Sequence, residues 1–360
     1  MATDAIPRFA ETAMQRYPWK DLVDFGAAFL MSKGVAEPDA RYVAEVAAKT
    51  EAMGIHTHGL VLLPYLAGKL GNDLDPRAQP VLIRQTPAIA LVDGNNGIGQ
   101  LAMRLAIELA RAKARTVGVG MAAVRNSSWI GALGVYLIPL AEEGLMAHLW
   151  AQTSTCRDCA PIGGLDARFS TNPIALAFPT GGDPVIADFS TAAVSMGRVG
   201  QMIRDGKKAI APIFMDKEGK VTDDPAVVKE GGTILFTGGE AQGHKGYALS
   251  LWCEALTALA GGDCNNPAAP QRQTFCLLVV DPDMFAGRQR YSTEMRRFVA
   301  HVKSSRLRPG FDAIRLPGER ALACLRRAQR EGVSLEEPLA KQLADLAESN
   351  RLPNPFRRSA

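Results

Sequence analysis

The chain has 360 residues, of which 47% are hydrophobic and 22% are charged, with 34 glycines and 22 prolines. These values are typical of a soluble globular protein and exclude a disordered chain, a collagen and a coiled coil. Lysine and arginine together number 41 against 37 acidic residues, and this net charge of +4, with the signs interspersed, is too small to indicate a nucleic-acid-binding protein.

The first part of the chain is predicted to be helical. Apolar side chains recur at helical spacing from residue 18 to about residue 70, and Asp39 is placed to cap the second helix. Charged residues such as Asp4, Arg8 and Glu11 precede any long apolar stretch, so we expect neither a signal peptide nor a membrane anchor. The six cysteines show no regular spacing, which favours a reducing compartment and a cytoplasmic location.

From Pro80 onward the pattern changes to alternating strands and helices. Residues 81–92 are predicted to form a strand, 93–97 a turn, 98–109 a helix and 117–124 another strand. This strand, helix, strand order is typical of an α/β layer. The other predicted elements are strands at 145–151, 173–178, 184–188 and 275–280, a helix at 245–259, and helices after Tyr291 that end in a polar tail at 350–360.

Helical character at both chain ends around a mixed centre predicts two domains and the fold class α/β (α+β). The helical domain would combine residues 1–78 with residues 285–360, and residues 79–284 would form a mixed α/β domain. The one basic stretch, between residues 288 and 308, favours a solvated helix face over an RNA site. We therefore expect neither a nucleic-acid partner nor a membrane partner.

Two histidines flank a hydroxyl in the segment from Gly54 to Gly59. An imidazole next to glycines, where a helix passes into a loop, is expected to be exposed. Its pKa near neutrality suits it to donate a proton during reduction of a carbonyl or imine group. A metal pair and a plain surface loop are the alternatives. His56 and His58 have a spacing found in metal sites, but no second cluster of ligands follows, so the sequence favours proton transfer without a metal.

A second candidate is Asp188, at the end of an apolar strand and followed by Ser190 and Thr191. Its carboxylate could fix the tautomer of a histidine and stabilise the charged imidazole, as aspartates do in hydrolases. The neighbouring hydroxyls could donate to a phosphate or a ribose. The spacing alone favours a helix N-cap over catalysis.

Glycines are dense between Gly238 and Gly246, where a helix is predicted to begin. Backbone amides at a helix N-terminus, together with Lys245, would form an anion site for a pyrophosphate or a carboxylate. The segment from Gly94 to Gly99 resembles a dinucleotide fingerprint only loosely and lacks the expected acid, which argues against a Rossmann fold.

Cys156 and Cys159 have the spacing of a redox pair or of half a zinc site. The sequence contains no second pair, and the surrounding loop lacks the strand-to-helix context of a thioredoxin-like motif. Incidental thiols are therefore favoured.

Eight segments, taken in order, resemble the type 2 malate/L-lactate dehydrogenase family over nearly the whole chain. They are Gly54–Gly59, Asp93–Gln100, Val124–Ser127, Ala160–Gly164, Thr171–Pro179, Ala187–Thr191, His244–Tyr247 and Leu316–Glu319. The resemblance implies a non-Rossmann NAD(P)-binding fold of the sulfolactate dehydrogenase-like type, a homodimer, and NAD or NADP as the cofactor. It also implies reduction of 2-oxo acids or cyclic imino acids, or the reverse oxidation.

The same resemblance implies roles for particular residues. His58 matches the family's proton donor, Thr57 stands where many members have serine, and Asp188 matches the acid of the relay. The dinucleotide-binding candidates are Ser154, Asp188, Ser190, Thr191, His244, Lys245, Gly318, Glu319 and Arg320. The substrate-binding candidates are Leu62, Asn126, Trp129, Thr171 and Asn172.

Two departures from the family pattern bear on the substrate. Trp129 takes the place of a histidine that some members use in the chemistry, and Leu62 takes the place of an arginine suited to bind a carboxylate bidentately. We therefore expect a more apolar pocket, shaped for larger rings, and a substrate that is bulkier or less acidic than lactate or malate.

The leading prediction is an NAD(P)-dependent dehydrogenase or reductase. The alternative from another class is a non-catalytic dinucleotide-binding protein, in which Leu62 and Trp129 mark an abandoned active site. A third is a metal- or redox-responsive protein built on the Cys156–Cys159 pair and the two histidines. The choice between NAD and NADP stays open because no fingerprint acid or basic pair identifies the 2′ group.

Overall fold

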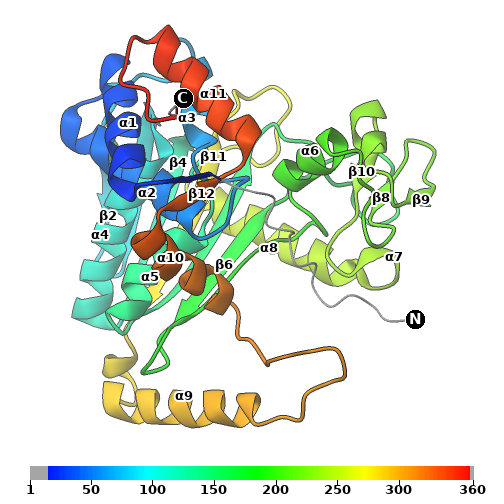
Figure 1. Ribbon diagram of the computed structural model, residues 1–360. Coiled ribbons are helices and arrows are strands. Elements are labelled where there is room, and N and C mark those ends of the chain that lie inside the picture. The colour runs from blue at the N-terminus through cyan, green and yellow to red at the C-terminus, as the bar shows by residue number, and fades with distance from the viewer. Residues whose placement is uncertain (1–14, 357–360) are drawn as a thin grey trace.

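The computed structural model describes residues 15–356. Asp4, Arg8 and Glu11 of the N-terminal prediction lie outside the described residues. A mixed sheet forms the centre of the molecule and is covered by helices, with a smaller lobe beside it (Figure 1). Across residues 15–356, no helix is both long enough and apolar enough to cross a membrane.

The central sheet has seven strands in the order β2-β3-β4-β11-β5-β6-β7. They are β2 (Val81–Gln85), β3 (Ile89–Gly97), β4 (Val119–Ser127), β5 (Met146–Thr153), β6 (Pro173–Phe178), β7 (Val185–Ser190) and β11 (Gln273–Val280). β3 and β4 pair in parallel and are connected through α4 (Gly99–Val117), whereas the other neighbours pair antiparallel. The strand, helix, strand unit is therefore confirmed, within a sheet that is otherwise antiparallel.

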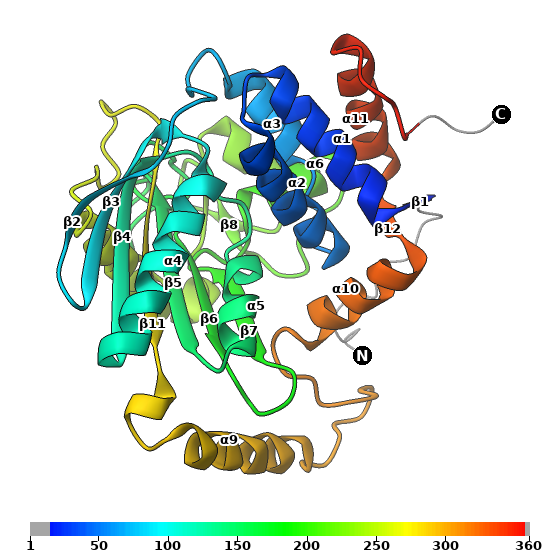
Figure 2. The same cartoon turned by 90° about the vertical axis from the view of Figure 1, so that its left-hand side faces the viewer.

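Alternating side chains of the sheet bury two different layers. On β4, Ala122 and Val124 belong to the main core with residues of α4, whereas Ala123 packs with Cys253 of α8 (His244–Ala258). The helix α5 (Gly134–Glu142) packs against β5, β6 and β7. Figure 2 shows α4 and α5 in front of the sheet, with the strands behind them.

Helices from the two chain ends pack together. They are α1 (Trp19–Ser32), α2 (Glu37–Ala52) and α3 (Leu62–Lys69) from the N-terminal part, and α10 (Glu319–Glu331) and α11 (Glu337–Ser349) from the C-terminal part. α2 contacts α10, α3 contacts α11, and β1 (Gln15–Tyr17) pairs antiparallel with β12 (Val333–Leu335). Residues from opposite ends of the chain thus share one core, while the predicted domain boundaries at 78/79 and 284/285 stay a prediction.

The sequence pattern predicts nothing of the smaller lobe between residues 191 and 243. It contains α6 (Met196–Arg204), β8 (Phe214–Met215), β9 (Val221–Thr222), the 3₁₀ helix η1 (Pro225–Glu230), β10 (Thr233–Ile234) and α7 (Gly239–Gln242). The side chains of Phe169, Phe214 and Phe236 lie in its separate core. Strands of two residues are too short to show the period-2 alternation from which strands are predicted.

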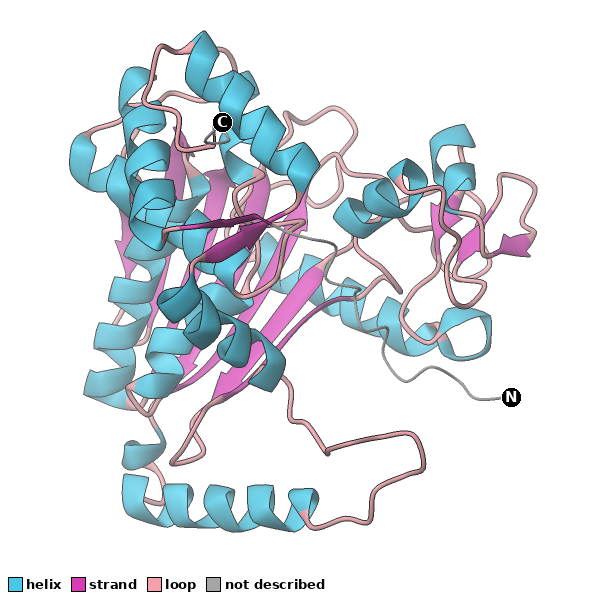
Figure 3. Ribbon diagram, viewed as in Figure 1, coloured by secondary structure: helices cyan, strands magenta, loops and turns pink. Residues whose placement is uncertain are grey.

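The helix α9 (Arg288–Lys303) stands apart from the sheet, after the 3₁₀ helix η2 (Pro282–Met284) (Figure 3). None of its residues is buried. An exposed helix is confirmed for this part of the basic stretch, while the choice of a solvated face over an RNA site stays a prediction.

Several local predictions are wrong. Asp39 does not cap the second helix, which begins at Glu37; its carboxylate instead accepts hydrogen bonds from Arg104 at 2.5 Å and from Gln79 at 2.8 Å. The predicted strand 81–92 is a hairpin of β2 and β3, because the chain reverses between residues 85 and 89.

The predicted turn at 93–97 is also wrong, since these residues belong to β3. Asn95 and Asn96 have left-handed backbone with φ of 52° and 56°, and the pairing of β3 with β4 shifts register between Asp93 and Gly97. At the C-terminus, Phe356 of the predicted polar tail is buried, with its ring 4.9 Å from that of Phe25.

Candidate active site

His58 lies in the loop between α2 and α3, where its backbone N–H donates to the Ile55 carbonyl at 3.0 Å. Thr57 Oγ1 lies 2.7 Å from His58 Nδ1, which leaves Nε2 as the ring atom for a substrate. The side chain is half-buried rather than exposed as predicted. Loss of hydration lowers the pKa of His58 to about 4, so the imidazole is neutral at pH 7.

Two aromatic rings form a wall beside this imidazole. The ring centroids of His58 and Trp129 are 5.4 Å apart, and Tyr65 meets Trp129 edge to face at 5.3 Å. Burial raises the pKa of Tyr65, against the lowering effect of the nearby Trp129 backbone. Leu62, in contrast to these two aromatic residues, is only 1% exposed and belongs to the main core.

Asp188 lies on β7, and its Oδ2 accepts a hydrogen bond of 2.7 Å from the N–H of Gly134, the first residue of α5. The dense protein around the carboxyl raises the pKa of Asp188 to about 6, against the lowering effect of the Gly134 and Leu133 amides. The side chain keeps contact with solvent, which tempers this rise. The N-cap alternative is wrong, because the next helix along the chain begins at Met196 and is capped by Ser195.

The loop between β4 and α5 connects these two groups. Trp129 and Gly131 of this loop lie against the His58 residue, since a Cβ added at Gly131 would be 3.3 Å from the His58 carbonyl. Gly134 at the end of the loop lies against Asp188. In the described part of the chain, however, His58 Nδ1 and the Asp188 carboxylate bond to different partners, so the predicted relay is not a direct hydrogen bond here.

The glycine-dense segment 238–246 is mostly helical, not a loop. α7 begins at Gly239, and Gly243 continues in helical conformation (φ −60°, ψ −21°) into α8. His244 and Lys245 therefore lie on the second turn of a nearly continuous helix, and both are exposed. The prediction that they follow directly on free N-terminal amides is wrong by about one turn of helix.

This helix nevertheless brings predicted dinucleotide contacts together. A Cβ added at Gly246 would be 2.7 Å from the Thr191 carbonyl oxygen, so the helix backbone lies directly against Thr191. His244 and Lys245 on this helix are exposed, whereas the hydroxyls of Ser190 and Thr191 donate to the carbonyls of Ala192 and Thr171. An exposed lysine suits phosphate oxygens.

The segment Gly318–Arg320 also reaches β7. Gly318 has φ of 93°, and a Cβ there would be 3.0 Å from Ile186, two residues before Asp188. The Ile186 N–H donates to the carbonyl of Pro317 at 3.0 Å. Glu319 pairs with Lys303, and Arg320 acts electrostatically on His56. This predicted dinucleotide segment therefore lies between Asp188 and the histidine loop.

Other predicted contacts are bonded within the protein. Ser154 is buried and donates to the Pro270 carbonyl at 2.8 Å. Asn172 has no exposed surface, and its amide donates to Ser250 Oγ at 3.0 Å and to Glu254 at 2.9 Å. Asn126 donates to Asp93 at 3.1 Å, and the Thr171 carbonyl accepts from Thr191 at 3.0 Å. Their roles toward ligands stay predictions.

Two neighbours of the site were not predicted from the sequence, Tyr65 and Glu51. For Tyr65, the only sequence feature that points to the site is its position three residues after Leu62. Glu51 does carry a sequence signal, because its carboxylate stands at a position where the apolar helical pattern of α2 faces the core.

The alternative chemistries find little support in the structure. Cys159 lies in the small-lobe core, and burial raises the pKa of both Cys156 and Cys159, which disfavours the reactive thiolate. Within residues 15–356, no three side chains of His, Cys, Asp or Glu are grouped to hold a metal ion.

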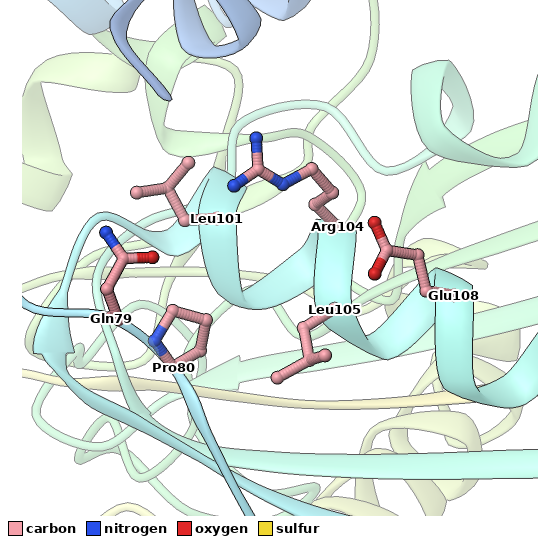
Figure 4. A pocket seen from close by; sticks show the side chains of 6 residues that line it. All are labelled: Gln79, Pro80, Leu101, Arg104, Leu105 and Glu108. Atoms are coloured by element: carbon pink, nitrogen blue, oxygen red, sulfur yellow. The ribbon is translucent and has the colours of Figure 1, made fainter. Parts of the chain in front are cut away.

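A cavity of about 370 Å³ lies elsewhere, between the segment 79–80 and α4. Figure 4 shows its lining, which is Gln79, Pro80, Leu101, Arg104, Leu105 and Glu108. None of the predicted site residues lines this cavity, so it is distinct from the candidate active site.

Comparison with known proteins identifies related enzymes. The family model described as malate/L-lactate dehydrogenase matches residues 17–344. The malate dehydrogenase of Pyrococcus abyssi is 30% identical over 92% of this chain and 94% of its own. The Delta(1)-pyrroline-2-carboxylate/Delta(1)-piperideine-2-carboxylate reductase of Pseudomonas syringae pv. tomato is 32% identical over 94% of this chain and 98% of its own.

The fold is similar as well. The solved structure of malate dehydrogenase from Pyrococcus horikoshii superimposes with a TM-score of 0.87 at 28% identity, covering 97% of this chain and 99% of that one. With a family model that spans most of its length and relatives that match it nearly end to end, the chain belongs to the malate/L-lactate dehydrogenase family.

Proposed function

We propose that this chain transfers hydride between NAD or NADP and a 2-hydroxy acid, a 2-oxo acid or a related cyclic imine, with His58 as the proton donor and acceptor. Membership of the family makes it a dehydrogenase or reductase. The observation that carries the proposal is the half-buried imidazole of His58, held at Nδ1 by Thr57 and flanked by Trp129.

In this proposal each polar group has a task. Nε2 of His58 takes the proton when a hydroxy acid is oxidised and returns it when an oxo acid or imine is reduced. Thr57 fixes the ring through Nδ1. Asp188, which accepts from the Gly134 amide, is assigned to favour the imidazolium form once the dinucleotide and the substrate are bound.

The dinucleotide would be held by nine residues, of which Asp188 and Ser190 lie on β7. These are Ser154, Asp188, Ser190, Thr191, His244, Lys245, Gly318, Glu319 and Arg320. When bound, the nicotinamide supplies or accepts the hydride, and the protein supplies orientation, a proton and electrostatics. The sheet has one parallel pair, which supports a binding mode distinct from the Rossmann type.

The substrate is proposed to be a cyclic imino acid or a bulkier oxo acid. Trp129 and Tyr65 give the site two aromatic surfaces. Leu62 lies in the core at the place where family members carry a carboxylate-binding arginine. One curated relative is named as a reductase of pyrroline- and piperideine-2-carboxylate, both cyclic imino acids.

We propose further that the protein is a cytoplasmic homodimer. α8 turns an apolar face outward, with Leu249, Trp252 and Leu259 exposed by 41%, 57% and 61%. Exposed apolar patches of this kind mark association surfaces. Cys253 and Cys276, buried as free thiols between α8 and the sheet, support a reducing compartment.

The homodimer predicts a mass twice that of the chain in sedimentation equilibrium. Trp252→Glu should weaken the association, because it places a charge at the centre of the apolar face. Phe298→Glu on the solvated helix α9 is the matched control and should leave the dimer intact. A monomer at every concentration would contradict the proposal.

Replacing His58 with alanine should lower kcat by roughly 10²- to 10⁴-fold, which is the usual contribution of a positioned acid–base group. The Kd of the dinucleotide, followed by nicotinamide fluorescence, should change little. An unchanged kcat would refute the role of His58. Dinucleotide binding by the wild type without turnover of any substrate would favour the binding-only alternative.

A panel of substrates tests the pocket. Oxidation of NADH and NADPH, followed by absorbance, should be faster with cyclic imino acids or bulky aromatic oxo acids than with oxaloacetate or pyruvate, because Trp129 and Tyr65 offer aromatic surfaces. Malate oxidation as fast as the best of these reactions would contradict the proposed substrate class.

The lowered pKa of His58 predicts opposite pH profiles for the two directions. Reduction needs the protonated imidazole, so its kcat/KM should fall as pH rises above about 4, by roughly tenfold per pH unit. Oxidation needs the neutral imidazole, so its kcat/KM should be lost only as pH falls toward 4. A reductive kcat/KM for a 2-oxo acid that is constant from pH 5 to pH 8 would oppose this assignment.

A further inference from the structure

Glu51, at the end of α2, has a carboxylate with no solvent exposure. Its two oxygens bond to opposite ends of the loop that carries His58. Oε1 lies 2.5 Å from His56 Nδ1, and Oε2 accepts a hydrogen bond of 2.9 Å from the backbone N–H of Leu60. The carboxylate therefore joins the residue two positions before His58 to the residue two positions after it.

The loop lies very close to this carboxylate. A Cβ added at Gly59 would be 2.8 Å from the Cα of Glu51, a distance that real Cβ atoms essentially never show. Gly59 follows His58 directly, so the backbone at the proton donor rests on the end of α2. A side chain at residue 59 would have to move the loop or the helix.

His56 connects the same loop to the C-terminal helices. Glu336 and Arg320 act on it electrostatically, and Glu336 accepts a hydrogen bond from Gln201 of α6 at 3.0 Å. Burial tends to lower the pKa of His56, but the hydrogen bond and charge of Glu51, together with Glu336, outweigh burial and Arg320 and raise it. The loop is thus tied to α2 by a pair that is strongest when His56 is protonated.

We propose that Glu51 and His56 are positioning residues for His58. The bridging carboxylate of Glu51 fixes the 56–60 loop, and the loop sets the distance from His58 Nε2 to the substrate. The inference rests on the proposed function, in which His58 moves the proton. Neither residue touches the substrate in this role.

The expected effect is on the chemical step and not on nucleotide binding. A displacement of about 1 Å at a reacting group can cost about 100-fold in rate. Removing the carboxylate would free both ends of the loop, leave the Leu60 amide without its acceptor, and leave His56 without its partner. Residues around β7 that bind the dinucleotide would keep their places.

The test compares Glu51→Ala with Asp39→Ala. Both remove a buried carboxylate from α2, and each carboxylate accepts from a basic side chain and from one further N–H donor, but Asp39 bonds to Arg104 and Gln79, outside the histidine loop. Both variants should lose thermal stability. At a temperature where both are folded, Glu51→Ala should lower kcat about 100-fold with an unchanged dinucleotide Kd, whereas Asp39→Ala should keep kcat within about twofold.

The conservative variant supplies a rescue. Glu51→Gln keeps an oxygen that accepts from Leu60 and an amide that can bond to His56, so its kcat should lie within roughly fivefold of the wild type, as expected for the loss of charge from one hydrogen bond. Equal losses of kcat in Glu51→Gln and Glu51→Ala, or in Glu51→Ala and Asp39→Ala, would overturn the proposal.

Two measurements are independent of turnover. Amide exchange at Leu60 should be faster in Glu51→Ala and unchanged in Asp39→Ala, and the NMR titration of the His58 imidazole should move toward its ordinary pKa as the loop exposes it. If neither changes, the positioning role is wrong. If both change while His58→Ala leaves kcat intact, the proposed function fails and the positioning of His58 by Glu51 stands.

Discussion

The histidine loop depends on one buried charge. The Glu51 carboxylate bonds to both ends of the loop, and the Gly59 backbone fits directly on the end of α2. A carboxylate without solvent is stable only when its hydrogen bonds are made, so the loop conformation and the charge require each other. The position of His58 against Trp129 follows from this local arrangement. The β4–α5 loop then connects Trp129 to Gly134, which bonds to Asp188.

The surrounding protein disfavours the charged form of both titrating groups of the site. The surrounding protein lowers the pKa of His58 to about 4 and raises that of Asp188 to about 6. At neutral pH the imidazole is therefore neutral while the carboxylate is charged. This state suits a base that accepts a proton from a hydroxy acid. In the reductive direction of the proposed reaction, the imidazole must gain a proton in the complex.

The sequence predicts the parts of this molecule whose signal is periodic or ordered along the chain. The long helices, most sheet strands and the parallel β3–β4 unit follow from spacing, and the family follows from eight ordered segments. The small lobe has strands of two residues, which are too short to show a periodic pattern of apolar side chains. Asp93–Gly97 has the composition of a turn, but it is an irregular part of β3, with Asp93 and Gly97 paired to β4 on either side of a register shift. Glu51 and Tyr65 join the site only through tertiary contacts, which spacing does not reveal.

The core position of Leu62 also limits how a substrate carboxylate can be bound. An arginine there would have to bury or redirect its charge, whereas leucine fills the core with almost no exposure. Lys69 and Arg272 act electrostatically on Tyr65, but both pair with Asp73, at 2.9 and 3.0 Å. A carboxylate at the aromatic wall would therefore have to compete with Asp73 for these cations. A substrate that gains more from contact with Trp129 than from a single ion pair suits this arrangement better than a small dicarboxylate does.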